Sequence, residues 1–293
     1  RQMCIRDRNR MPQFPGKYRD LYWLDIDTKR TTKIAEVPNI RDEQFGRWLI
    51  DHDGNARGFT TSHDKGQDYK PNSPRDGLYT YVYLMDPKTK EYSRMASCKH
   101  QEPCFMPLTF DFDNRSLFGV GQAVLPDGSL DPDWDYTDTN ALWLYDTVEK
   151  KYIEKVFHDP KYDFSNPRQG YSDGYVLQDT INKINYGLSY YAETRKYVYW
   201  DETYGVLRES LQATFPEDQL SMYASSDFSK IIVSTSSDKS PGSAYFYDVE
   251  KGGIVQVAEY APWLKDYELG DMVPFEFTSR DGLDLTGYIT LPP

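Results

Sequence analysis

One five-residue stretch has the form of a nucleophile motif. GYSDG, residues 170–174, matches the G-x-S-x-G pattern that holds a catalytic serine on a strained turn between a strand and a helix. Here DFSNPRQ precedes the motif and YVLQDT follows it, which predicts a loop and then a strand. An α/β-hydrolase also carries its histidine after the serine. In this chain all four histidines precede it: His52, His63, His100 and His158. We therefore predict that Ser172 is not catalytic, and we assign no catalytic residue to this chain.

Two other stretches hold residue types that bind metal ions. DGSLDPDWDYTD, residues 127–138, contains five aspartates whose oxygens could bind Ca²⁺. It lacks the glycine that an EF-hand loop has at its sixth position, so we interpret it as a solvated surface loop. CKHQEPC places His100 between Cys98 and Cys104, but a zinc site needs about four ligands and no second cluster exists in the sequence. We predict no metal and no cofactor, since P-loop, dinucleotide-binding and H-E-x-x-H motifs are missing as well.

The same two cysteines allow two interpretations. A Cys98–Cys104 disulfide would close a small loop and indicate an oxidising compartment. Two unpaired thiols in a loop fit the sequence equally well. The cysteines therefore leave the compartment open.

The first eight residues are interpreted as foreign. RQMCIRDR, residues 1–8, resembles the translation of a widely used transposase sequencing adapter. We expect this segment, Cys4 included, to be a processing scar on a bacterial, metagenomic sequence whose true N-terminus is missing. The localisation then stays open between periplasm and cytoplasm, with a preference for the periplasm.

Composition restricts the partners. The chain has a formal net charge of −12 at pH 7 and a mean hydropathy of −0.74. Nucleic acids and anionic membranes select basic surfaces, so we predict neither as a partner. No apolar run approaches the roughly 18 residues that a membrane span needs. Aromatic residues make up 15% of the chain among many Asp, Gly and Pro, which favours short strands joined by turns.

An internal repeat indicates the architecture. A short aromatic strand ending in aspartate recurs about every 60 residues through its first three copies. The interval to the fourth copy is about 100 residues, so we expect a hidden copy near KYVYWDETYG, residues 196–205. The four copies are LYWLDIDT (21–28), YVYLMDPKT (81–89), LWLYDTVEK (142–150) and AYFYDVEKG (244–252), with Asp25, Asp86, Asp146 and Asp248 as the strand-ending residues.

A second element recurs upstream of three of these copies. It consists of a strand, a polar turn led by Asp53, Asp113 or Asp227, and a second strand. We expect these three aspartates to accept backbone N–H groups in their turns, which is a structural role. A unit of about four short antiparallel strands over some 50–60 residues is typical of a β-propeller blade. We predict an all-β fold, an incomplete β-propeller of four-stranded antiparallel blades with about four blades and the end of another.

Two segments depart from the repeat. In YGVLRESLQATFP, residues 204–216, Leu207, Leu211 and Phe215 recur every four residues, which predicts one amphipathic helix between blades. At the end of the chain, two strand-like runs flank Asp281-Gly282, the dipeptide of a tight type I′ hairpin.

The C-terminal seventy residues resemble a known family. They are similar to the propeller-to-hydrolase junction of the prolyl oligopeptidase family of serine peptidases, particularly its bacterial dipeptidyl aminopeptidase and acylaminoacyl-peptidase branch. The resemblance covers essentially the whole chain after residue 8, strongly at the C-terminal end and loosely before Asn140. The matching residues are Ser236, Ser237, Asp238, Pro241, Gly242, Pro262, Trp263, Leu264, Arg280, Asp281, Gly282, Gly287, Tyr288, Thr290, Leu291 and Pro292.

This resemblance implies a division of the chain. Residues 9–260 would form a partial propeller, 261–274 an interdomain linker, and 275–293 the first hairpin of a truncated α/β-hydrolase domain. The family's Ser-Asp-His triad and oxyanion hole lie in that domain, so none of those residues is in this sequence. The propeller of the family restricts access to short peptides, which would be the substrates of the full-length parent. We expect this fragment alone to be inactive. Without the rest of that sheet, the hairpin residues Phe275, Phe277, Leu283 and Leu285 should lie exposed or poorly packed.

Two other functions fit a propeller. One is a stand-alone β-propeller that binds a partner without catalysis, although the hairpin after residue 274 has no role in a closed ring. The other is a propeller glycosidase with paired carboxylates, which needs a separation of acids that a sequence does not show. The oligomeric state stays open.

Overall fold

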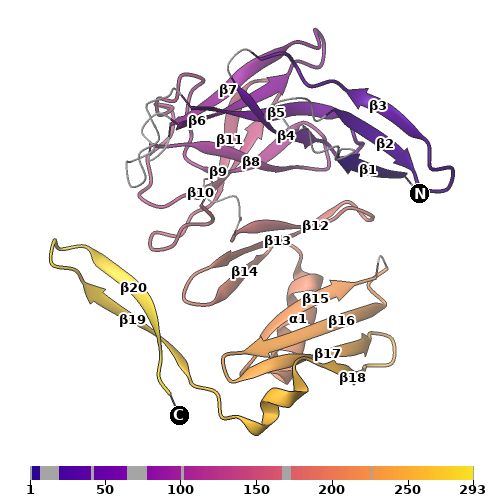
Figure 1. Cartoon of the computed structure of the whole chain (residues 1–293), viewed down its shortest axis with the longest axis vertical. Coiled ribbons are helices and arrows are strands. Elements are labelled where there is room, and N and C mark those ends of the chain that lie inside the picture. The colour runs from indigo at the N-terminus through magenta and orange to yellow at the C-terminus, as the bar shows by residue number, and fades with distance from the viewer. Residues whose placement is uncertain are drawn as a thin grey trace, which may run out of the picture. The chain divides into compact units, whose positions relative to one another are not determined.

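The computed structural model describes residues 2–6, 20–40, 43–64, 78–99, 102–166, 173–225 and 227–292 (Figure 1). By its internal contacts the chain divides into two compact units, residues 1–176 with 189–192 and residues 177–188 with 193–293. Short antiparallel strands dominate both units, which confirms the predicted all-β architecture of repeated blades. Within the described ranges, no helix is both long and apolar enough to cross a membrane.

The first unit holds three antiparallel sheets in its described residues. One has three strands in the order β1-β2-β3, and two have four strands, in the orders β4-β5-β6-β7 and β11-β10-β9-β8. Each four-stranded sheet is a meander in which neighbours in sequence are neighbours in space, as in a propeller blade. The strands are β1 (Gln2–Arg6), β2 (Leu21–Asp25), β3 (Thr31–Ala35), β4 (Gln44–Ile50), β5 (Ala56–Asp64), β6 (Leu78–Met85), β7 (Tyr92–Lys99), β8 (Phe105–Phe110), β9 (Ser116–Gly121), β10 (Ala141–Asp146) and β11 (Lys151–Phe157).

The main core of this unit lies between the two four-stranded sheets. Val82, Phe105 and Trp143 are completely buried there, because alternate residues of each strand point to the same face. The Trp143 indole N–H donates to the Gly121 carbonyl at 2.9 Å, so its polar atom is satisfied. Gly119 makes room for this packing, since a Cβ there would lie 2.1 Å from the Phe105 ring.

The strand-ending aspartates close the turns that follow them. Each carboxylate accepts backbone N–H groups two or three residues later, as Asp86 does from Lys88 at 2.8 Å and from Thr89 at 3.1 Å. The residue four positions after the aspartate adopts a left-handed conformation, which glycine tolerates best. It is lysine in four turns and glycine in one: Lys29, Lys90, Lys150, Lys183 and Gly252, with φ between 56° and 64°.

The upstream aspartates share the turn role only in part. Asp113 accepts from the backbone N–H groups of Arg115 and Ser116 at 2.8 and 2.7 Å, and Asp227 accepts from that of Ser229 at 3.1 Å, as predicted. In the first copy Asp51 takes this role. Asp53 instead accepts from the side-chain amide of Asn114 at 2.7 Å, in the next sheet. The prediction for Asp53 was wrong, because Asp51 accepts the backbone N–H groups of this turn.

The second unit contains a further blade, a helix and a hairpin. The strands are β12 (Tyr175–Asp179), β13 (Ile184–Tyr191), β14 (Arg195–Tyr199), β15 (Gln219–Ala224), β16 (Lys230–Ser237), β17 (Ser240–Asp248), β18 (Gly253–Glu259), β19 (Met272–Thr278) and β20 (Asp284–Thr290). β12-β13-β14 form a three-stranded sheet that begins outside this unit, and β15-β16-β17-β18 form a four-stranded one. β14 lies where the hidden copy was expected, but Asp201 after it caps a helix and closes no strand turn. The aspartate-closed turn of this sheet follows Asp179, between β12 and β13, and a 3₁₀ helix (Pro262–Asp266) follows β18.

The predicted helix is present as α1 (Glu202–Thr214). Asp201 caps it, accepting the Tyr204 N–H at 2.7 Å. Leu211 is buried against the β15–β18 sheet, with Leu207 beside it, while Tyr204 stacks on Tyr186 of the β12–β14 sheet at 4.5 Å. The helix therefore fills the space between two sheets of this unit, as its apolar spacing indicated.

The C-terminal hairpin differs from the prediction in its turn. A type I′ turn needs positive φ at both central residues, but only Gly282 has it, at 86°. The Gly282 N–H donates to the Ser279 carbonyl and the Ser279 N–H to the Leu283 carbonyl, which gives a three-residue loop with glycine at its left-handed position. β19 also begins at Met272, within the segment predicted as linker.

One face of this hairpin is apolar. Residues that pair directly across two strands lie on the same face, which places Val273 with Ile289 and Phe277 with Leu285. We call the set Val273, Phe275, Phe277, Leu285 and Ile289 the hairpin apolar face. Its five side chains are 40–48% exposed, and Leu283 in the loop is 60% exposed, which confirms the expected exposure.

The adapter-like segment also enters a sheet. β1 pairs antiparallel with β2, from Gln2 opposite Asp25 to Arg6 opposite Leu21. This pairing does not test where residues 1–8 came from, so their foreign origin stays a prediction.

Candidate functional site

Ser172 lies outside the described residues, so its surroundings stay a prediction. The structure does describe the chain after the motif. Residues 175–179 form β12, a strand, where a nucleophile motif requires a helix. The predicted strand after GYSDG is confirmed.

His52 is held by the fold. Its ring stacks on Phe112 with centroids 4.3 Å apart, and its Nε2 lies 2.7 Å from the Phe110 carbonyl. A carbonyl only accepts hydrogen bonds, so Nε2 carries a proton and donates it there. His52 thus joins the β4–β5 turn to the neighbouring sheet. His100 falls outside the described residues.

His158 contacts a hydroxyl, but with the wrong polarity for catalysis. Its Nε2 lies 2.9 Å from Thr139 Oγ1, and that hydroxyl also donates to the Asp159 carbonyl at 2.5 Å. Because the Thr139 proton points at Asp159, the histidine donates to the hydroxyl and does not accept from it. A nucleophile needs the opposite arrangement.

The carboxylate of Asp159, which lies next to His158, has a structural role. It accepts the Tyr190 hydroxyl at 2.9 Å. Burial raises the pKa of Tyr190 to about 12, and the bond to Asp159 adds to that rise. Although burial acts in the opposite direction, the hydrogen bonds from Lys161 and Tyr190 hold the pKa of Asp159 below its usual value. Both groups keep their usual charge at neutral pH.

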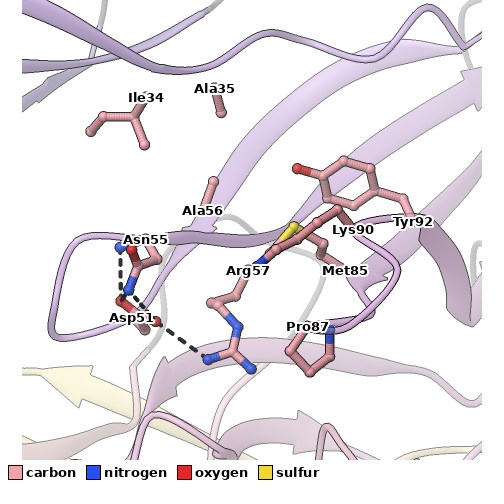
Figure 2. Close-up of a pocket in the computed structure, with 10 residues that line it drawn as sticks. All are labelled: Ile34, Ala35, Asp51, Asn55, Ala56, Arg57, Met85, Pro87, Lys90 and Tyr92. Carbon is pink, nitrogen blue, oxygen red and sulfur yellow. Dashed lines mark hydrogen bonds and ion pairs between the residues drawn. The ribbon is translucent and has the colours of Figure 1, made fainter.

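A cavity of about 370 Å³ lies beside β3 and the β4–β7 sheet (Figure 2). Its polar side is formed by Asp51, Asn55 and Arg57. Figure 2 shows Asp51 bound to both of the others. The remaining lining residues are mostly apolar: Ile34, Ala35, Ala56, Met85, Pro87 and Tyr92, with Lys90 at the edge.

Asp51 and Arg57, the two charged residues on the polar side of this cavity, bind each other. The Asp51 side chain is 1% exposed and accepts from Arg57 Nη1 at 3.3 Å and from the Asn55 backbone at 2.8 Å. Arg57 also donates to the Asn114 carbonyl and lies 5.5 Å from the Phe110 ring centroid. This arrangement ties two sheets together and offers no activated nucleophile. No motif or repeat in the sequence marked this ion pair, although Asp51 directly follows β4.

The acidic loop makes local turns. Asp127 accepts the Ser129 N–H at 2.9 Å and Asp131 accepts the Asp133 N–H at 3.0 Å. In the part of the chain that the structure describes, no group of three or more His, Cys, Asp or Glu could hold a metal ion.

Cys98 and Cys104 form a disulfide, which selects one of the two interpretations left open by the sequence. Both residues are buried, at 4% and 3% exposure. The bridge joins the end of β7 to the residue before β8, so it fixes the connection between two consecutive sheets.

Asp238, one of the residues that carried the family resemblance, links the last blade to the hairpin. The Asp238 carboxylate accepts the Met272 N–H at 2.7 Å, which links the β16–β17 turn to the first residue of β19. This hydrogen bond is the main cause that lowers the pKa of Asp238. Lys239 pairs with Asp271 at 2.6 Å beside it. Gly242 has φ 88° and packs so closely on the Thr235 carbonyl that a Cβ would lie 1.6 Å from it.

Repeated antiparallel meanders with aspartate-closed turns make this a protein built of β-propeller-type blades. No family model and no curated protein matches the chain. Among solved structures, a protein assigned as a dipeptidyl aminopeptidase IV from Bacteroides ovatus is 11% identical, with a TM-score of 0.42 over 94% of this chain and 50% of its own. A puromycin hydrolase is 11% identical, with a TM-score of 0.43 over 93% of this chain and 38% of its own. An oligogalacturonate lyase in complex with manganese is 15% identical, with a TM-score of 0.43 over 94% of this chain and 72% of its own.

The chain thus spans half or less of the length of the first two of these proteins.

Proposed function

We propose that this chain is the propeller part of a serine peptidase of the prolyl oligopeptidase family. In this proposal the propeller controls the entry of short peptides, and the Ser-Asp-His triad belongs to an α/β-hydrolase domain that follows in the parent protein. The 293-residue chain then has no peptidase activity of its own.

The hairpin apolar face carries this proposal. β19 and β20 pair only with each other in the described residues, and an isolated two-stranded hairpin is marginally stable in water. Five large apolar side chains on one face, each 40–48% exposed, would gain about 25 cal/mol for every Å² buried against a partner. The sheet of a hydrolase domain would supply both the missing strand neighbours and the missing apolar contact.

The junction supports the same division of the parent protein. Asp238 and the Lys239–Asp271 pair fix the base of the hairpin to the last blade, while the hairpin itself extends beyond it. A hairpin anchored in this way sets the direction in which a following domain continues. A blade that bound a partner on its own would not require such an extension.

The proposed gating role follows from the blades. A ring of rigid sheets over an active site excludes folded proteins and bulk water while it admits short chains. The substrates of the parent would then be short peptides.

Reading the source DNA beyond Pro293 tests the proposal. The expected result is a coding sequence that continues for a few hundred residues and contains G-x-S-x-G between a strand and a helix, followed by Asp and His. A stop codon directly after Pro293 would contradict the proposal and favour a stand-alone binding propeller.

Hydrogen exchange tests the hairpin on the protein itself. In the 293-residue chain we expect the amides of β19 and β20 to exchange much faster than those of β16, since few contacts protect them. Joining the following coding region should slow the exchange of the hairpin and leave β16 unchanged. Equal, slow exchange in both proteins would show that the hairpin needs no further domain.

A further inference from the structure

The first unit contains a second cavity at a position equivalent to that of Figure 2. It has a volume of about 380 Å³. In the first cavity Met85 and Tyr92 are opposite each other across two strands, and in the second Tyr145 and Tyr152 are. Each pair flanks one of the aspartate-closed turns. The blade repeat has therefore built the same kind of cavity twice.

The second cavity has a mostly apolar wall that is held in place. The Tyr152 hydroxyl accepts the Val124 N–H and donates to the Val124 carbonyl, both at 3.0 Å, so the long β9–β10 loop is fixed over the cavity. The apolar lining comes from both sheets and this loop: Leu84, Met95, Val124, Leu125, Pro126, Pro132, Tyr145 and Tyr152.

Charges of both signs line this cavity. Lys150 comes from the β10–β11 turn, Lys151 begins β11, and Asp131 and Asp133 come from the β9–β10 loop. Arg94 of β7 also lines the cavity, but it pairs with Glu43 at 3.5 Å. The cavity of Figure 2 has a different set of charges. Asp51 is the only carboxylate among its described lining residues, and it is buried in an ion pair with Arg57. The second cavity therefore has two acidic side chains, Asp131 and Asp133, that have no equivalent in the first cavity.

Lys150 stands in a conformation that does not suit lysine. Its φ is 56°, where glycine occupies the equivalent position of another turn, Gly252. Lys29, Lys90 and Lys183 adopt the same conformation in their turns, so it belongs to the repeated turn, and a glycine at position 150 is expected to keep that turn. The ammonium reaches the neighbouring sheet, where Ser93 Oγ lies 3.5 Å away.

We propose that this second cavity binds a small zwitterion with an apolar side chain, namely a free hydrophobic α-amino acid or a dipeptide of such residues. The carboxylate of the ligand is bound by Lys150 and Lys151, its ammonium by Asp131 and Asp133, and its side chain packs among the apolar lining. The site lies at β7 and β11, which are the last strands of two consecutive sheets. The proposal for this site does not depend on the proposed peptidase function.

Calorimetric titration of the full 293-residue chain with three probes tests this site. L-phenylalanine carries both charges, N-acetyl-L-phenylalanine lacks the ammonium, and L-phenylalaninamide lacks the carboxylate. We expect saturable binding of phenylalanine, and weaker binding of both analogues by about two- to fivefold, the value of one exposed ion pair.

Variants assign each charge to its end of the ligand. Lys150→Gly keeps the left-handed turn and removes the ammonium, so it should weaken phenylalanine binding by about two- to fivefold and leave phenylalaninamide unchanged. Asp131→Asn should weaken phenylalanine and leave the N-acetyl probe unchanged. Lys90→Gly makes the same change in the equivalent turn of the other cavity, so it should leave all three affinities unchanged.

Three results would overturn the proposal. They are the absence of saturable phenylalanine binding, equal affinity for all three probes, and an equal loss from Lys90→Gly and Lys150→Gly. Circular dichroism of each variant shows whether it has folded before its affinity is compared.

Discussion

Reduction of the Cys98–Cys104 disulfide should destabilise the first unit by a calculable amount. The bridge closes a seven-residue loop, residues 98–104, and fixing its ends removes chain entropy from the unfolded state. For a loop of that length the entropic relation gives about 2.4 kcal/mol at 25 °C. Both cysteines are already buried, so the loss of the covalent link is the main change expected on reduction.

Urea unfolding followed by tryptophan fluorescence measures this effect, because Trp143 lies in the core of the same unit. We expect the free energy of unfolding to fall by about 2–3 kcal/mol on adding dithiothreitol. Cys4→Ser serves as the background, since it removes the third thiol. A Cys98→Ala/Cys104→Ala double variant in that background should match the reduced protein and no longer respond to reductant. Equal stability with and without reductant, or two titratable thiols in the untreated Cys4→Ser protein, would refute the reasoning.

Three further predictions concern the core, the turns and the hairpin. Gly119→Ala should destabilise the first unit by about 1–3 kcal/mol in urea unfolding, because its Cβ would lie 2.1 Å from the buried Phe105 ring, whereas Gly253→Ala, with open space around it, should be nearly neutral. Hydrogen bonds from Arg115 are the main cause that lowers the pKa of Asp146 to about 2 from 3.8, so the wild-type protein should lose stability as pH falls from 3.8 towards 2. Asp146→Asn should be less stable at pH 7 and show a flatter profile over that window, and an unchanged profile would contradict the assignment. Phe275→Ser/Phe277→Ser should lower the binding of a hydrophobic dye, whereas Glu276→Gln on the opposite face should not; equal dye binding would show that the hairpin apolar face is not the exposed patch.

The repeat made the blades predictable from sequence. Aspartates such as Asp86 and Asp146 recur because each closes the same turn, and the strands before them are short runs rich in aromatic and aliphatic residues. The helix was predictable for a similar reason, since Leu207 and Leu211 follow its period. Both are local sequence patterns, and each corresponds directly to a local structure, a turn or a helix.

Features that depend on competition within a turn were predicted less well. Asp51 and Asp53 stand two residues apart, and in the structure Asp51 accepts the backbone N–H groups while Asp53 bonds to Asn114 near the next sheet. The Asp281-Gly282 dipeptide likewise indicated a two-residue turn, but the hydrogen bonds of Ser279 and Leu283 give a three-residue loop. Sequence alone shows which residues could make the hydrogen bonds of a turn, but not which of them do.

The disulfide and the cavities were the features that the sequence predicted least. The disulfide needed the end of β7 and the start of β8 to be near each other, which residue spacing allowed but did not require. The cavity lined by Lys150 and Asp131 joins residues from two sheets and a long loop. No period in the sequence marks such a juxtaposition.

Labelling with a fluorophosphonate, which reacts with activated serines, tests most directly whether the catalytic residues lie outside this chain. The 293-residue protein and a protein extended by the coding region that follows Pro293 are treated side by side, with Ser172→Ala in both. We expect the 293-residue chain to stay unlabelled and the extended protein to be labelled at the serine of its own G-x-S-x-G motif, whether or not Ser172 is present. Labelling of the 293-residue chain, lost in Ser172→Ala, would place the nucleophile in the propeller and contradict the account.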